Sequence, residues 1–67
     1  MSERIRLDHL CAREGVNEAR RTAAQIAELY QSSISNPAHF ASHPDWKPLF
    51  EQSMRELTQF AESGRIP

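Results

Sequence analysis

The chain has 67 residues, of which 39% are hydrophobic and 25% are charged. Eight basic and nine acidic side chains give a formal net charge of -1, so the chain as a whole has no positive field that would attract nucleic acid or an acidic membrane. So short a chain forms a single domain, residues 1–67. It has too few residues to form a substrate pocket together with the residues that would hold the pocket's lining in place. These values exclude most classes of enzyme and predict a single small globular domain without catalytic activity.

The single cysteine, Cys11, excludes an intramolecular disulfide and is typical of a reducing compartment. The first residues lead into no apolar segment of the kind that a signal peptide contains. No apolar run approaches the roughly 18 residues that a membrane span requires. We therefore expect a cytoplasmic protein that does not associate with membranes.

A short first helix is predicted over residues 5–14. Leu7, Leu10 and Cys11 recur at helical spacing and would form one apolar face, and Gly15 supplies the left-handed residue that commonly ends a helix. Because two to three turns are too short to be stable alone, this helix must pack on its own chain or on a partner.

The second helix is predicted over residues 18–35, with Asn17 as its N-cap. It ends at Asn36–Pro37, because proline disfavours helical geometry in the residue before it. The apolar stripe of this helix is narrow and rich in alanine: Ala19, Ala23, Ile26, Ala27, Tyr30 and Ile34. Such a stripe allows another helix to approach closely.

The connection that follows contains a possible extra helical turn over Pro37–Ala41, with Asn36 as its cap. Beyond it, Ser42 and Asp45 have the spacing of a capping box, although aspartate replaces the preferred glutamate or glutamine. This pattern predicts that the third helix begins between Ser42 and Trp46.

The third helix is predicted over residues 45–63 and ends before Gly64. Its apolar side chains fall on one face together with Ser53: Trp46, Leu49, Phe50, Met54, Leu57, Phe60 and Ala61. The opposite face is charged or polar and includes Glu51 and Arg55 in the favourable order for an ion pair. The fold class is therefore all-α, an antiparallel helical hairpin with a short N-terminal helix.

The apolar face of the third helix is larger than the alanine stripe of the second helix can cover. We expect the hairpin to be completed as a helical bundle, either by dimerisation or by docking on a partner. The predicted partner-binding residues are Trp46, Phe50, Met54, Leu57, Phe60 and Tyr30. The predicted function is a non-enzymatic protein–protein interaction module without a cofactor, acting as a homodimer or as an accessory or regulatory subunit of a larger protein complex.

A small dimeric DNA-binding regulator is the alternative, with Arg13, Arg20 and Arg21 as the binding residues. Against it, residues 1–21 carry five basic and four acidic side chains, whereas appreciable binding needs about six or more neutralised phosphates. No aromatic side chain lies among these arginines to stack on unpaired bases.

A metal-binding module is a further alternative, because His39 and His43 are four residues apart and two histidines at that spacing on a helix can bind one ion. However, Pro44 interrupts regular helix at this point, and a closed zinc site requires four ligands. We therefore predict no metal site. Cys11 shares the apolar face with Leu7 and Leu10, where a thiol is usually inert.

Overall fold

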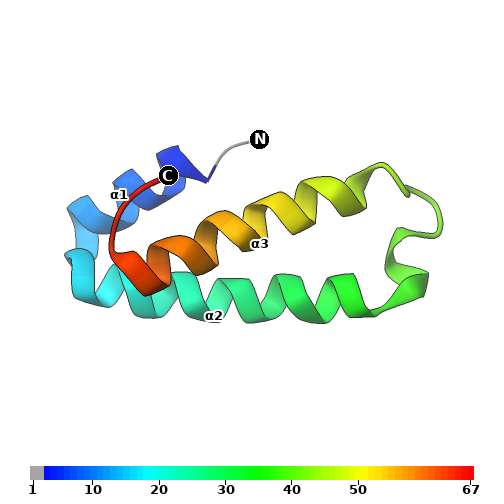
Figure 1. Ribbon diagram of the computed structural model, residues 1–67, viewed down its shortest axis with the longest axis horizontal. Coiled ribbons are helices and arrows are strands. Elements are labelled where there is room, and N and C mark those ends of the chain that lie inside the picture. Colours follow the sequence, from blue (N-terminus) through cyan, green and yellow to red (C-terminus); the bar gives the residue numbers. More distant parts are fainter. Residues whose placement is uncertain (1–2) are drawn as a thin grey trace.

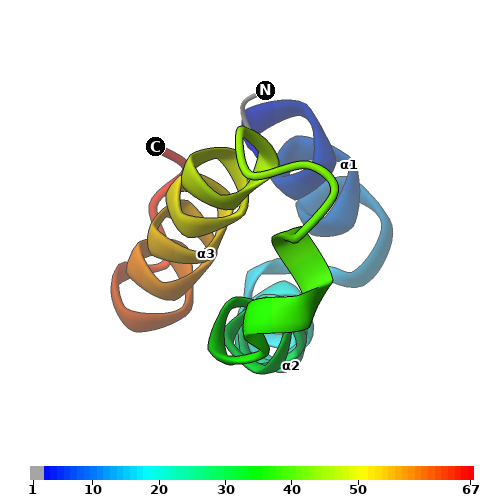
Figure 2. The same ribbon diagram turned by 90° about the vertical axis from the view of Figure 1, so that its right-hand side faces the viewer.

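The computed structural model describes residues 3–67, and these form an up-down-up arrangement of helices (Figure 1). Helix α1 spans Arg4–Glu14, α2 spans Val16–Ser35 and α3 spans Trp46–Ser63, with a 3-10 turn, η1, over Pro37–Phe40. The described residues are therefore all-α, and α2 and α3 pack along each other as the predicted hairpin. Viewed along the bundle, the three α-helices lie at the corners of a triangle (Figure 2).

The core contains side chains from all three helices, so the short first helix packs within its own chain. Leu57 and Phe60 are completely buried, as is Leu7. The buried cluster consists of Leu7, Leu10, Ala19, Ala23, Ala27, Leu57 and Phe60. The alanines of α2 bring its backbone close to α3, and the large side chains of α1 and α3 fill the space between the helices.

Helix α1 has 11 residues, whereas α2 has 20 and α3 has 18. At about 1.5 Å per residue, α1 can cover only about half the length of the hairpin. It lies over the end where α2 begins and α3 finishes, and leaves the end near η1 without a third helix (Figure 1). Apolar side chains at the opposite end of the hairpin must therefore be covered by residues outside α1.

The joint between α1 and α2 differs from the prediction. Helix α2 begins at Val16, and Gly15 rather than Asn17 occupies its N-cap position, with φ 84° and ψ 159°. Gly15 thus has positive φ as expected but an extended ψ, in a region that is essentially restricted to glycine. The amide of Gly15 still donates to the carbonyl of Cys11 at 2.9 Å, and its own carbonyl accepts from Ala19. One residue therefore ends the first helix and starts the second.

Of the other helix ends, some agree with the sequence-based prediction and one does not. Asn36 caps η1 as predicted, its side-chain oxygen accepting from the amide of Ala38 at 3.1 Å. Gly64 adopts the left-handed conformation, and its amide donates to the carbonyl of Phe60 at 2.7 Å. The capping box of Ser42 and Asp45 was wrong, because Asp45 has helical backbone angles and its side chain makes no cap hydrogen bond to the described residues. Backbone turns through Pro44 lead into α3 instead.

The two glycines with positive φ provide a test of these helix ends. Gly64→Ala should cost about 1 kcal/mol of unfolding free energy, because alanine tolerates the left-handed region at moderate cost. Gly15→Ala should cost more, up to about 3 kcal/mol, although its Cβ would meet no atom within 4 Å. Urea denaturation of the two variants measures the difference. An equal or smaller loss for Gly15→Ala would contradict the assigned backbone conformation.

Candidate protein-interaction surface

Large apolar side chains are exposed at the end of the hairpin that α1 does not cover. Leu29 of α2 is 69% exposed, and on α3 Leu49 is 49% and Trp46 is 44% exposed. Beside Leu29 is a cavity of about 190 Å³. Its lining residues are Ile26, Leu29, Tyr30, Ser33 and Phe50. We call Ile26, Leu29, Tyr30, Trp46, Leu49 and Phe50 the hairpin-end surface.

An aromatic cluster holds this surface together from beneath. The ring of Phe50 makes edge-to-face contacts with Tyr30, at a centroid distance of 5.2 Å, and with Phe40, at 5.1 Å. Phe40 is buried although it belongs to the η1 turn. Edge-to-face pairs at these distances are favourable beyond the area that they bury. Phe40 therefore closes part of the end of the hairpin that lies beyond the reach of α1, and it packs on Phe50, which in turn contacts Tyr30.

The loop before α3 is ordered by a second aromatic contact. The ring of His43 stacks on Trp46 at a centroid distance of 3.9 Å and an interplanar angle of 5°. Trp46 nevertheless remains 44% exposed, so one of its faces is engaged while other atoms of the indole remain accessible. An aromatic side chain held in place loses little entropy on binding, which makes Trp46 a suitable anchor for a partner.

The structure separates the six predicted partner-binding residues into two groups. Trp46 is exposed, and Tyr30, Phe50 and Met54 are half-buried, so these four can meet another molecule. Leu57 and Phe60 are completely buried and cannot. For these two residues the prediction does not fit the fold, because Leu7 and Leu10 of α1 complete the core around them. The sequence pattern could not decide whether α1 packs on its own chain.

Leu29 was missed by the sequence analysis, although it is among the most exposed apolar side chains of the described residues. It lies outside the alanine stripe of α2, on the side where polar residues predominate. In the sequence Leu29 is a single large apolar residue on an otherwise polar face, and single exposed apolar residues are common on protein surfaces. Its position beside Ile26, Tyr30 and Phe50 is seen only in the folded chain.

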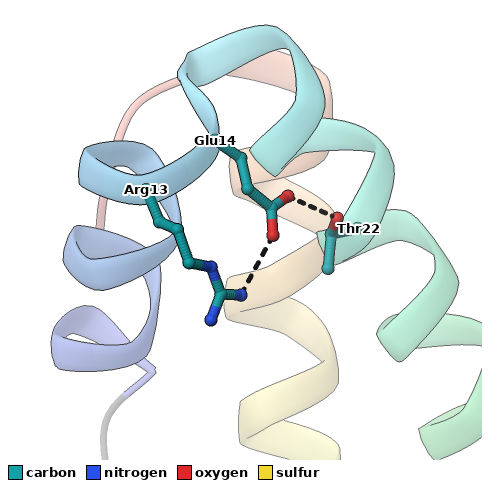
Figure 3. A network of polar contacts seen from close by, with 3 residues as sticks. All are labelled: Arg13, Glu14 and Thr22. Atoms are coloured by element: carbon teal, nitrogen blue, oxygen red, sulfur yellow. Dashed lines mark hydrogen bonds and ion pairs between the residues drawn. The ribbon is translucent and has the colours of Figure 1, made fainter.

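The three arginines considered for DNA binding all have partners within the chain. Arg13 pairs with Glu14 at 3.0 Å, and the other carboxylate oxygen of Glu14 accepts from the hydroxyl of Thr22 at 3.1 Å (Figure 3). Arg21 pairs with Glu18 at 3.1 Å. The carboxylates at positions 14 and 18 thus partly neutralise the positive charge that a phosphate would require.

Arg20 has a structural role that the sequence did not indicate. Its Nε donates to the carbonyl of Ala61 and its Nη2 to the carbonyl of Glu62, each at 2.9 Å. These carbonyls belong to the last turn of α3, where helix geometry leaves carbonyls unpaired and where a positive charge is favoured by the helix dipole. The side chain therefore ties the end of α3 to the start of α2.

The candidate metal ligands do not gather at one place. His39 contacts the rings of Phe40 and Phe50, whereas His43 stacks on Trp46. Over residues 3–67 there is no group of three or more histidine, cysteine, aspartate or glutamate side chains that could hold an ion. Cys11 is half-buried and packs against the core.

None of the helices described is both long enough and apolar enough to cross a membrane. Comparison of the chain with protein-family models, with curated proteins and with solved structures finds no match.

The role of Arg20 can be tested against its neighbour. Arg20→Ala should lower the free energy of unfolding by about 1–3 kcal/mol, because it leaves two carbonyls of α3 without a charged donor. Arg21→Ala is the matched control, since its side chain is 75% exposed and its ion pair lies at the surface; it should change stability by less than about 0.5 kcal/mol. Urea denaturation measures both, and similar losses would contradict the assignment.

Proposed function

We propose that the chain is a small helical protein–protein interaction module without chemistry of its own. It docks on a larger protein through the hairpin-end surface and serves there as an accessory or regulatory subunit. The observation that supports this is the exposure of Leu29, Trp46 and Leu49, three large apolar side chains at the same end of the hairpin. Water contact with so much apolar surface is unfavourable, and covering it with a partner would remove that cost.

The form of the surface also favours a protein partner over a small molecule. The cavity of about 190 Å³ between α2 and α3 is smaller than the pockets of roughly 300–1,000 Å³ that usually hold ligands. It is of a size to receive one or two apolar side chains of a partner. Trp46 and Leu49 on the adjoining turns of α3 would then pack against the surface around those side chains.

Substitution of the two exposed leucines tests the proposal. The double variant Leu29→Glu, Leu49→Glu should remain folded, because both side chains are largely exposed, and it should lose the partner, because two carboxylates would be desolvated in the contact. The control is Gln25→Glu, Gln52→Glu, which adds the same charge to exposed positions of the same helices. Circular dichroism checks the fold of each variant.

The measurement is affinity capture from the native cell followed by mass determination of the intact complex. We expect the wild-type chain and the glutamine control to be recovered in a complex of defined mass with a larger protein. The leucine double variant should be recovered without it. Recovery of the same complex with both leucines replaced, or of wild-type chain without any larger partner, would refute docking through this surface.

A further inference from the structure

Two of the three histidines of the chain lie at the hairpin end, and both contact aromatic rings there. The imidazole of His43 lies parallel to the indole of Trp46, with 3.9 Å between the ring centroids. His39 contacts Phe40 at a centroid distance of 5.1 Å, but the two rings cross at 73°. Histidine is the side chain that gains a proton near neutral pH. A change of charge therefore takes place in direct contact with the aromatic residues at this end of the hairpin.

The stacked geometry of His43 favours the protonated ring. A cation within about 6 Å of an aromatic centroid is attracted by the negative face of the ring, and the attraction is strongest for tryptophan. The centroid distance of 3.9 Å and the interplanar angle of 5° place the imidazole over the face of the Trp46 indole. At an exposed site, protonation should strengthen such a contact by about two- to fivefold in its equilibrium constant.

The N-terminus of α3 opposes this effect only weakly. A positive charge is disfavoured beside the first turn of a helix, because unpaired amides give that end a partial positive charge. Two of these amides are already paired with the loop before α3. Trp46 donates to the carbonyl of His43 at 3.0 Å, and Lys47 donates to the carbonyl of Pro44 at 3.4 Å. The direct ring contact therefore decides the sign, and protonation of His43 strengthens the stack.

The other charged groups at this end largely offset one another. The titratable and charged side chains on the surrounding elements are His39 of η1, Tyr30 of α2, Asp45 in the loop, and Lys47 and Glu51 of α3. Helix α2 carries no charged side chain after Glu28. Two of these groups are negative, and two are positive once His39 is protonated. No ion pair found among residues 3–67 involves His43. The contact with Trp46 is thus the interaction that distinguishes the charged from the neutral imidazole.

We propose that the His43–Trp46 stack makes the hairpin-end surface pH-dependent, because protonation of His43 clamps the indole of Trp46 where it meets the partner. The inference rests on the proposed function, since it concerns regulation of the same surface. A side chain that is already held loses less entropy on binding. His43 is itself exposed, so its charge can stay in water at the rim of the contact. Docking should therefore strengthen as the pH falls from about 8 to about 5, and by no more than the two- to fivefold gained in the stack.

The fluorescence of Trp46 tests the stack directly, because this residue is the only tryptophan of the chain. A protonated imidazole in contact with an indole quenches its emission. We expect the emission of the wild type to fall as the pH is lowered from 8 to 5, and His43→Gln should abolish this change. His9→Gln and His39→Gln are the controls and should retain it, since neither ring stacks on Trp46.

Urea denaturation at pH 5 and pH 8 tests the sign of the effect. A stack that favours the protonated ring contributes stability at pH 5 that is lost as the pH rises. His43→Gln should therefore raise the unfolding equilibrium constant by about two- to fivefold more at pH 5 than at pH 8. In a Trp46→Leu background, which should remain folded because Trp46 is 44% exposed, the same substitution should have equal effects at both pH values. Circular dichroism follows unfolding in all variants.

Trp46 emission that does not depend on pH, or that depends on it equally in His43→Gln, would overturn the proposal. A loss of stability in His43→Gln that is the same at pH 5 and pH 8 would also overturn it. These measurements need no partner, so they can succeed when capture of a larger protein fails. With the captured complex, the wild type should retain more partner at pH 5 than at pH 8, whereas His43→Gln should retain equal amounts. Equal retention by the wild type would refute the regulation of docking.

Discussion

The packing of α1 over one end of the hairpin determines which apolar side chains this chain buries by itself. Leu7 and Leu10 close the core around Leu57 and Phe60, but a helix of 11 residues ends before it reaches the other end of α2. Phe40 closes that end only in part, by packing on Phe50. The apolar residues beyond, Leu29 and Leu49 among them, stay in contact with water because the chain has no third helix left to cover them.

Contacts at both ends of the hairpin hold α2 and α3 in place. Arg20 fixes the end of α3 against the start of α2. At the other end, the aromatic contacts among Tyr30, Phe40 and Phe50 hold the hairpin-end surface. This surface is therefore preorganised, which reduces the entropy that a partner would have to overcome on binding.

Much of the fold could be predicted from local signals. Helical periodicity identified each α-helix, and the roles of Asn36 and Gly64 followed from their own conformational preferences. The start of α2 was misplaced because Asn17 is a good cap by type, whereas the sharp reversal at the joint requires the backbone freedom of Gly15. The roles of Leu57, Phe60 and Arg20 depended on contacts between distant segments. A single sequence reports the apolar face of a helix but not which neighbour covers it.

The central claim is that α1 covers Leu57 and Phe60 of its own chain. Isotope-filtered NOE spectroscopy on a mixture of labelled and unlabelled protein tests it most directly, because it separates contacts within a chain from contacts between chains. The account predicts NOEs from the methyl groups of Leu7 and Leu10 to Leu57 and Phe60 within one chain only. The same NOEs between labelled and unlabelled chains, or their absence altogether, would contradict it.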